Sequence, residues 1–290
     1  MRRVRDLVLR AQPNQSLTLE EMRERFPTIF AEQPHESRSD RYVYISTSDM
    51  LEELMLRDFL PVEAAVSRTR DEQRRPFTKH LLRFRHAADL RGGGERRVGD
   101  TSFEVIMRNA HDGTSRYKFM AGLLRLICLN GCVVSDGTVS EVSVLHAGNR
   151  DKQLSTVVEG AYTVLEQGPK VMEKIRTWQG IQLKDDQRTA YAEAAHSLRF
   201  ANAEGKITTP VTPSQLLHPR RYQDDKHDLW STFNVVQENV IRGGLTGIGR
   251  DANGRMRRST TREVRGIDGD IKLNRALWQL TERMAELAAA

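Results

Sequence analysis

Segments with the composition of β-strands lie between residues 42 and 146, and the periodicity of amphipathic helices follows after about residue 150. Residues that favour strands dominate seven short segments: 42–45, 62–66, 81–85, 103–107, 116–120, 132–134 and 142–146. An Asp112-Gly113 pair, a hairpin signal, separates two of them. From Asp151 onward, apolar residues recur every three or four positions, as in amphipathic helices. Strands grouped before helices favour an α+β fold, with an antiparallel sheet and hairpin in the N-terminal half and a helical C-terminal half.

The same patterns predict how the chain is organised. The 290 residues are enough to bury a sizeable core. No apolar run approaches the roughly 20 residues that span a bilayer, and two cysteines make no disulfide framework, so we expect a cytoplasmic protein without membrane contact. We expect an N-terminal arm at 1–40, an α+β core at 41–150, a helical region packed on it at 151–242, a Gly/Arg-rich flexible segment at 243–269 and a C-terminal helix at 270–290.

Sequence signals for catalysis and metal binding are weak. Cys128 and Cys132 have no second pair of metal ligands, and the eight histidines form no HExxH motif. The phosphate-loop and GxSxG motifs are missing. We expect no cofactor, no metal site and no catalytic residue. A metal-dependent hydrolase built from His111, His146 and distant carboxylates is the least favoured alternative.

Arginine dominates the positive charge. Lysine and arginine outnumber the acids by 45 to 39, and 36 of the 45 are arginine. Guanidinium groups match phosphate geometry and stack on bases, which suits a nucleic-acid binder. A GC-rich genome would also raise the arginine content, but it would do so evenly along the chain. Clustering of the arginines therefore matters more than their number.

One arginine-rich region lies in the strand-forming half. Along 116–120, Arg116 and Lys118 alternate with Tyr117 and Phe119, so a cationic side would oppose an aromatic side. Cations of this kind can follow phosphates while bases stack on exposed rings. The alternative is that the rings belong to the core and the cations are merely solvated. The candidate binding residues in this half are Arg83, Arg85, Arg96, Arg97, Arg108, Arg116, Tyr117, Lys118 and Arg125.

A second cluster lies at residues 250–265. Six arginines face only Asp251 and Glu263 there, within Gly/Ser/Thr-rich sequence. A flexible arm of this composition can follow a polyanion, and an inert solvated linker is the alternative. The candidate binding residues in this cluster are Arg255, Arg257 and Arg258.

Three segments carry a family resemblance: Gly122-Leu-Leu-Arg125-Leu-Ile-Cys128-Leu-Asn130-Gly131, Val144-Leu-His146-Ala-Gly148-Asn149 and Asp228-Leu-Trp230-Ser-Thr-Phe233-Asn234. Together they resemble a phage- and plasmid-borne domain-of-unknown-function family (nine-three-two), over about residues 40–242. The resemblance implies a mobile-element protein but no particular activity. The strand–hairpin–helix order with a basic hairpin is also similar, in topology, to single-strand annealing proteins of recombination.

These observations lead to two main hypotheses. The first is a non-enzymatic phage or plasmid protein that binds single-stranded nucleic acid, with strand annealing as a homo-oligomer as a further expectation. The second is an interaction protein that inhibits a host defence system, with its basic surface against an acidic patch of a host protein.

Overall fold

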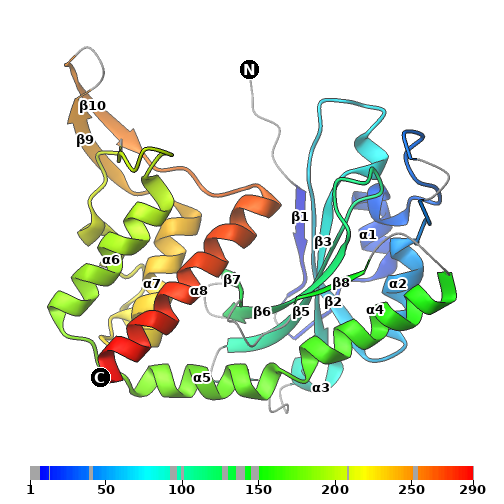
Figure 1. Cartoon of the computed structure of the whole chain (residues 1–290), viewed down its shortest axis with the longest axis horizontal. Coiled ribbons are helices and arrows are strands. Elements are labelled where there is room, and N and C mark those ends of the chain that lie inside the picture. Colours follow the sequence, from blue (N-terminus) through cyan, green and yellow to red (C-terminus); the bar gives the residue numbers. More distant parts are fainter. Residues whose placement is uncertain are drawn as a thin grey trace. The chain divides into compact units, whose positions relative to one another are not determined.

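The computed structural model describes residues 7–12, 14–38, 42–91, 97–98, 101–125, 130–134, 141–144, 150–207, 209–250 and 254–289. The chain forms two compact units, Met1–Met172 and Glu173–Ala290. The first contains an antiparallel, curled sheet and the second is mainly helical, as Figure 1 shows. The expected α+β class is therefore confirmed.

All strand pairs of the sheet in the first unit are antiparallel. The order along the sheet is β1-β2-β3-β5-β6-β7, with β4 beside β5 and β8 beside β6. The expected strand at 42–45 is wrong, because these strand-forming residues run into a helix without pairing. The other six expected strands are confirmed. The strands are β1 (Leu7–Arg10), β2 (Phe59–Val66), β3 (His80–His86), β4 (Arg97–Val98), β5 (Thr101–Asn109), β6 (Tyr117–Arg125), β7 (Asn130–Val133) and β8 (Val142–Val144).

The predicted central hairpin joins β5 and β6. Val105 pairs with Ala121 and Arg108 pairs with Lys118 across it. Gly113 in the connecting turn has a φ of +77°, a conformation that side chains with a Cβ rarely adopt. A Cβ at Gly113 would also lie 2.0 Å from the Arg38 guanidinium. The positive φ therefore favours glycine in the turn, whereas the flexible Arg38 side chain could move away from an added Cβ.

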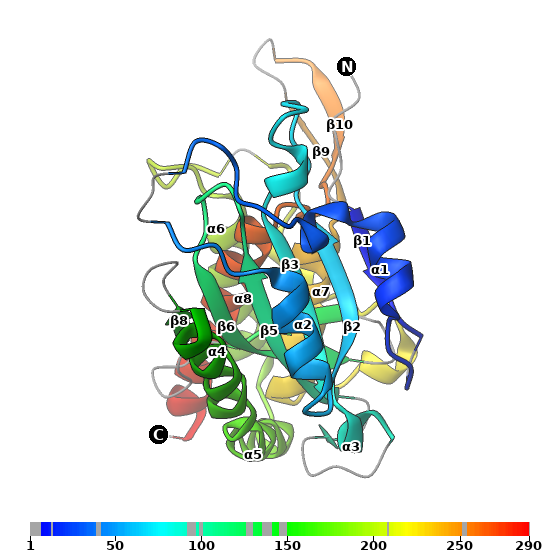
Figure 2. The ribbon, with the colours of Figure 1, turned by 90° about the vertical axis from the view of Figure 1, so that its right-hand side faces the viewer.

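Helices cover one face of this sheet. Figure 2 shows α2 (Thr47–Met55) and α4 (Arg150–Leu165) lying across β2, β3, β5 and β6. Phe84 and Phe119 of the sheet, and Leu54 of α2, are fully buried in the resulting core. The shorter elements of the unit are α1 (Leu19–Arg25), η1 (Pro27–Phe30), η2 (Arg75–Phe77) and α3 (Ala87–Leu90).

The helices begin at residues that satisfy free backbone N–H groups. Thr18 and Glu21 form the capping box of α1. Ser46 caps α2, because its hydroxyl accepts the Asp49 N–H at 3.2 Å and the helix starts at Thr47. Asp49 lies in the first turn, where a negative charge interacts favourably with the helix dipole.

The second unit is built around all three tryptophans of the chain. Trp178, Trp230 and Trp278 are buried, and the rings of Trp178 and Trp278 lie 4.6 Å apart. Phe233 stacks on Trp230 at 5.3 Å. The elements of this part of the chain are α5 (Gly168–Gly180), α6 (Asp185–Phe200), η3 (Pro213–Leu217), η4 (Tyr222–Asp224), α7 (Leu229–Arg242), β9 (Thr246–Arg250), β10 (Met256–Thr260) and α8 (Ile267–Ala289).

Two boundaries differ from the sequence-based organisation. The division between the units falls inside α5 instead of at residue 151, because α4 packs on β6 and β8 of the sheet. The segment expected to be flexible at 243–269 contains the strands β9 and β10 and the first turn of α8. Within the part of the chain that the structure describes, no helix combines the length and apolar character needed to cross a membrane.

Candidate nucleic-acid interface

The strands β9 and β10 form a two-stranded antiparallel hairpin, which we call the arginine hairpin. Met256 pairs with Arg250, and Arg258 pairs with Ile248. Because side chains alternate across a sheet, these four residues share one face, and their side chains are exposed. In Figure 1 the hairpin projects away from the helices α6 and α7 of its own unit.

The opposite face of the arginine hairpin carries Arg257 and Ser259, which are paired with Gly249 and Gly247, and the two glycines rest on the chain near Pro210. A Cβ at Gly247 would lie 2.4 Å from the Pro210 carbonyl oxygen, and a Cβ at Gly249 would lie 2.8 Å from the Pro210 Cβ. The Gln215 Nε2 atom also donates to the Thr246 carbonyl at 2.8 Å. Glycine at these positions therefore lets the hairpin backbone approach Pro210 closely, which fixes where the hairpin lies on its unit.

An open groove of about 620 Å³ runs along the arginine hairpin. Four arginines line it, together with the hydroxyl-bearing residues Ser259 and Thr260. Guanidinium and hydroxyl groups are the usual protein donors to phosphate oxygens. The groove therefore has the chemistry of a phosphate-binding surface. Its arginines are Arg250, Arg257, Arg258 and Arg262.

Three of these guanidinium groups are free for a ligand. Among the described residues, none forms an ion pair or hydrogen bond with the side chains of Arg257, Arg258 or Arg262. The nearest acid along the chain, Glu263, pairs instead with Arg265 at 2.9 Å. Like charges held together without acidic partners raise the local positive potential, which attracts polyanions.

Arg199 of α6 supports the end of this surface. Its Nη2 atom donates to the Arg262 carbonyl oxygen at 3.1 Å, and its guanidinium lies 5.5 Å from the centre of the Phe200 ring. Burial lowers the pKa of Arg199 below its usual value. This hydrogen bond holds the backbone of Arg262 and does not involve the Arg262 guanidinium.

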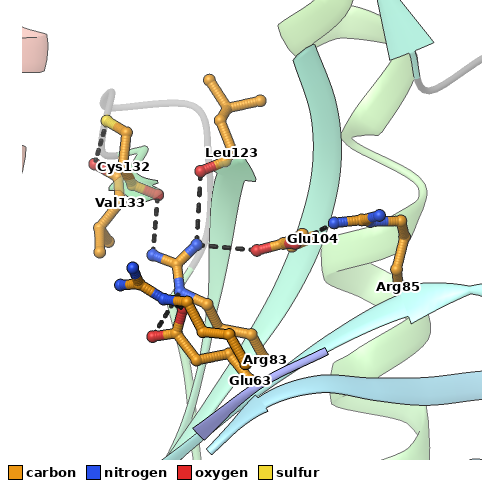
Figure 3. A network of polar contacts seen from close by, with 8 residues as sticks. Glu63, Arg83, Arg85, Glu104, Leu123, Cys132 and Val133 are labelled. Carbon is orange, nitrogen blue, oxygen red and sulfur yellow. Dashed lines mark hydrogen bonds and ion pairs between the residues drawn. The ribbon is translucent and has the colours of Figure 1, made fainter. Parts of the chain in front are cut away.

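Two arginines expected to bind phosphate, Arg83 and Arg85, are buried instead. They are 4% and 2% exposed, and both donate to Glu104 at 2.8 Å. Figure 3 shows Glu104 between the two arginines. Arg83 also donates to the carbonyl oxygens of Leu123 and Cys132. Their assignment as nucleic-acid-binding residues is wrong, because neither guanidinium can reach a ligand without breaking a buried ion pair.

The ion pairs continue across neighbouring strands. Arg10 of β1 lies 2.6 Å from Glu63 of β2, and Glu63 lies 3.9 Å from Arg83 of β3. Arg83 in turn forms an ion pair with Glu104 of β5. A buried charge is costly unless it is paired and hydrogen-bonded, and here each carboxylate contacts two arginines. We infer that the intact charge network stabilises the sheet relative to one that has lost a partner.

The expected stacking residue Tyr117 is also buried. It is 0% exposed, as is Phe119, so the prediction that either ring stacks on bases is wrong. The Tyr117 hydroxyl donates to the Ile45 carbonyl oxygen at 3.0 Å and lies 3.0 Å from Thr47 Oγ1. Burial raises the pKa of Tyr117 well above its usual value.

Thr47 is the centre of a buried polar cluster in the first unit. Its Oγ1 atom lies 2.9 Å from His80 Nε2, 3.1 Å from His111 Nε2 and 3.2 Å from Asn109 Nδ2. All of these side chains are fully buried, so His111 faces no open site. His146, the other histidine of the hydrolase hypothesis, lies outside the described residues. No group of three metal-ligating side chains occurs in the residues described.

The other candidates of the first unit do not form a free row of cations. Arg116 is exposed, whereas Lys118 pairs with Glu141. Arg108 and Arg125 are half-buried and have polar partners. Arg96 and the side chain of Arg97 lie outside the described residues.

In the second unit, Arg257 and Arg258 lie together on β10, and Arg255 precedes them with a contact of its own. Sequence reasoning missed Arg250 and Arg262 as individual site residues, and it missed the exposed apolar side chains of Ile248 and Met256. The available signal was the alternation of Gly247, Ile248, Gly249 and Arg250, which fits a strand with one side pressed against backbone.

Comparison with known proteins identifies the family. The model of the family described as "Domain of unknown function (DUF932)" matches residues 34–278. Two Escherichia coli (strain K12) proteins, UPF0380 protein YafZ and UPF0380 protein YfjQ, are each 44% identical over 279 residues, which cover 96% of this chain and 94% of each relative. No solved structure matches the chain. The resemblance inferred from the sequence is confirmed, and the chain belongs to the DUF932 family.

Proposed function

We propose that the chain binds single-stranded nucleic acid through the arginine hairpin. The observation that carries this proposal is that Arg257, Arg258 and Arg262 all line one open groove and have no acidic partner among the described residues. A strand that lies in the groove would bring phosphates to these guanidinium groups and release condensed counterions. Such binding is tolerant of sequence and weakens steeply with salt.

The shape of the groove favours a single strand over a duplex. The hairpin has two strands of five residues each, so it spans only about 17 Å. A single strand bends easily and can bring successive phosphates into one short groove, as in proteins that track its backbone. Arginine planes can also stack on bases that a duplex would keep paired. Strand annealing, homo-oligomer formation and a host protein partner stay predictions.

The test is the salt dependence of binding to a labelled 20-nucleotide strand, measured by fluorescence anisotropy. Each phosphate contact of a single strand contributes about 0.7 to the slope of log affinity against log salt. The double variant Arg257→Ala/Arg258→Ala should therefore bind more weakly and lose about 1.4 from the slope. Tryptophan fluorescence should stay unchanged, because the three rings lie in the core of the same unit.

A matched control removes two arginines elsewhere in that unit. Arg176 of α5 and Arg283 of α8 have side chains 52% and 67% exposed, each paired with a nearby glutamate. Arg176→Ala/Arg283→Ala changes the net charge equally and should leave the slope unchanged. Equal losses of slope in both double variants, or no binding by the unaltered protein, would remove the hairpin from the site.

A further inference from the structure

Two large apolar side chains are exposed on the face of the arginine hairpin that points away from Pro210. Ile248 is 66% exposed and Met256 is 63% exposed. Burying aliphatic side chains of this size stabilises a protein, and leaving two of them in water forgoes that stabilisation. They are also the only large apolar side chains of the described parts of β9 and β10.

These apolar side chains alternate with cations. Ile248 is paired across the hairpin with Arg258, and Met256 is paired with Arg250. Paired residues have Cβ atoms about 5 Å apart, and the two pairs are about 7 Å apart along the strands. Each apolar side chain therefore has one arginine opposite it on the partner strand and another arginine two residues away on its own strand. Elsewhere in the unit, Leu198 and Leu287 are exposed on helices, outside any such pattern.

We propose that Ile248 and Met256 form an apolar platform for unstacked nucleobases, while Arg250 and Arg258 hold the phosphates on either side. The proposal rests on the proposed function and extends its site from the groove beside Pro210, which Arg250 and Arg258 also line, to the opposite face of the hairpin. The neighbouring guanidinium groups favour a nucleic-acid strand as the ligand, because an apolar surface bordered by cations complements a chain of flat bases joined by anionic phosphates. A partner without negative charge would leave those cations unpaired.

The platform also explains how the protein would distinguish single strands from duplexes. In a duplex the faces of the bases are stacked on each other, so they are inaccessible to Ile248 and Met256. The phosphates of a duplex remain available to the arginines. Arginines would thus provide affinity for any nucleic acid, and the two apolar side chains would provide the preference for unpaired bases.

The test compares a 20-nucleotide oligothymidylate with an abasic strand of equal length, which has the same phosphates and no bases. The unaltered protein should bind the oligothymidylate about 10-fold more tightly, because bases that stack on the two apolar side chains add to the affinity that the phosphates provide. Ile248→Thr/Met256→Thr keeps strand-forming residues and should abolish most of this preference. Its affinity for the abasic strand and its salt slope should not change.

Controls separate the possible outcomes. Leu287→Thr removes an apolar side chain that is 56% exposed on α8, and it should leave the 10-fold preference intact. Ile248→Phe offers a ring in place of an aliphatic group and should raise the preference even if the threonine variant fails to form the hairpin.

Equal affinity of the unaltered protein for oligothymidylate and the abasic strand would overturn the platform while leaving the proposed function in place. An Ile248→Phe variant with unchanged preference would also overturn it. If neither strand binds, the proposed function itself fails.

Discussion

Removal of the Glu104 carboxylate should destabilise the first unit strongly. The Glu104 side chain is 0% exposed, and each of its oxygens accepts from an arginine at 2.8 Å, Oε2 from Arg83 and Oε1 from Arg85. Replacing it by alanine would leave two guanidinium groups buried without the carboxylate that they share. Breaking a buried pair in this way costs about 3–5 kcal/mol. We therefore expect Glu104→Ala to lower the free energy of unfolding by about 4 kcal/mol.

The assay is urea unfolding followed by far-UV circular dichroism, with tryptophan fluorescence recorded in parallel. Fluorescence reports only the second unit, because Trp178, Trp230 and Trp278 all lie there. For a unit of this size, a loss of about 4 kcal/mol corresponds to a fall in melting temperature of about 8–16 °C.

The control is Glu53→Gln in the same unit. Glu53 pairs with Arg57 on the surface of α2, where both side chains are more than 30% exposed. A pair of this kind contributes about 0.3–0.5 kcal/mol. If Glu104→Ala cost no more than Glu53→Gln, the buried ion pairs would not stabilise the sheet as inferred.

Three further predictions concern separate parts of the molecule. Burial raises the pKa of Tyr42 to about 12 and that of Tyr117 well above its usual value, whereas both hydroxyls ionise at their ordinary pKa in the unfolded chain. The free energy of unfolding should therefore be fully retained below pH 10 and should fall as the pH rises toward 12, which urea unfolding at stepped alkaline pH would measure. Gly247→Ala should weaken strand binding in the anisotropy assay, because its Cβ would strike the Pro210 backbone, whereas Gly266→Ala has open space and should not. Asp228→Ala removes the cap that accepts the Ser231 N–H at 2.9 Å, and urea unfolding should show a loss of about 1 kcal/mol.

Local sequence patterns predicted the sheet well. The Asp112-Gly113 turn and the strand formers on either side of it specify the β5–β6 hairpin without help from distant residues. Strand propensity alone was insufficient at residues 42–45, where Tyr42 and Tyr44 are half-buried outside the sheet. A strand needs a partner, and propensity does not say whether one is available.

The buried arginines could not be recognised from alternation. Arg83 and Arg85 alternate with Leu82 and Phe84, a pattern that normally indicates a solvated face. Their acidic partners come from other strands, Glu63 from β2 and Glu104 from β5, and only the strand register brings them together. A single sequence shows where charges lie along the chain but not which of them are paired in space.

The arginine hairpin was missed as a structure although its composition was noticed. Glycine is depleted in strands, so Thr246-Gly-Ile-Gly-Arg250 resembled a flexible linker. The structure explains the glycines by the close approach of Pro210. That contact joins segments about 40 residues apart, and local patterns carry no information about it.

Hydrogen–deuterium exchange with and without an unlabelled 20-nucleotide strand would locate the bound surface on the intact protein. Protection from exchange is expected in peptides that cover residues 246–262, with little change in those that cover the β5–β6 hairpin at 101–125. Protection confined to 101–125, with exchange at 246–262 unaffected by the strand, would contradict nucleic-acid binding by the arginine hairpin.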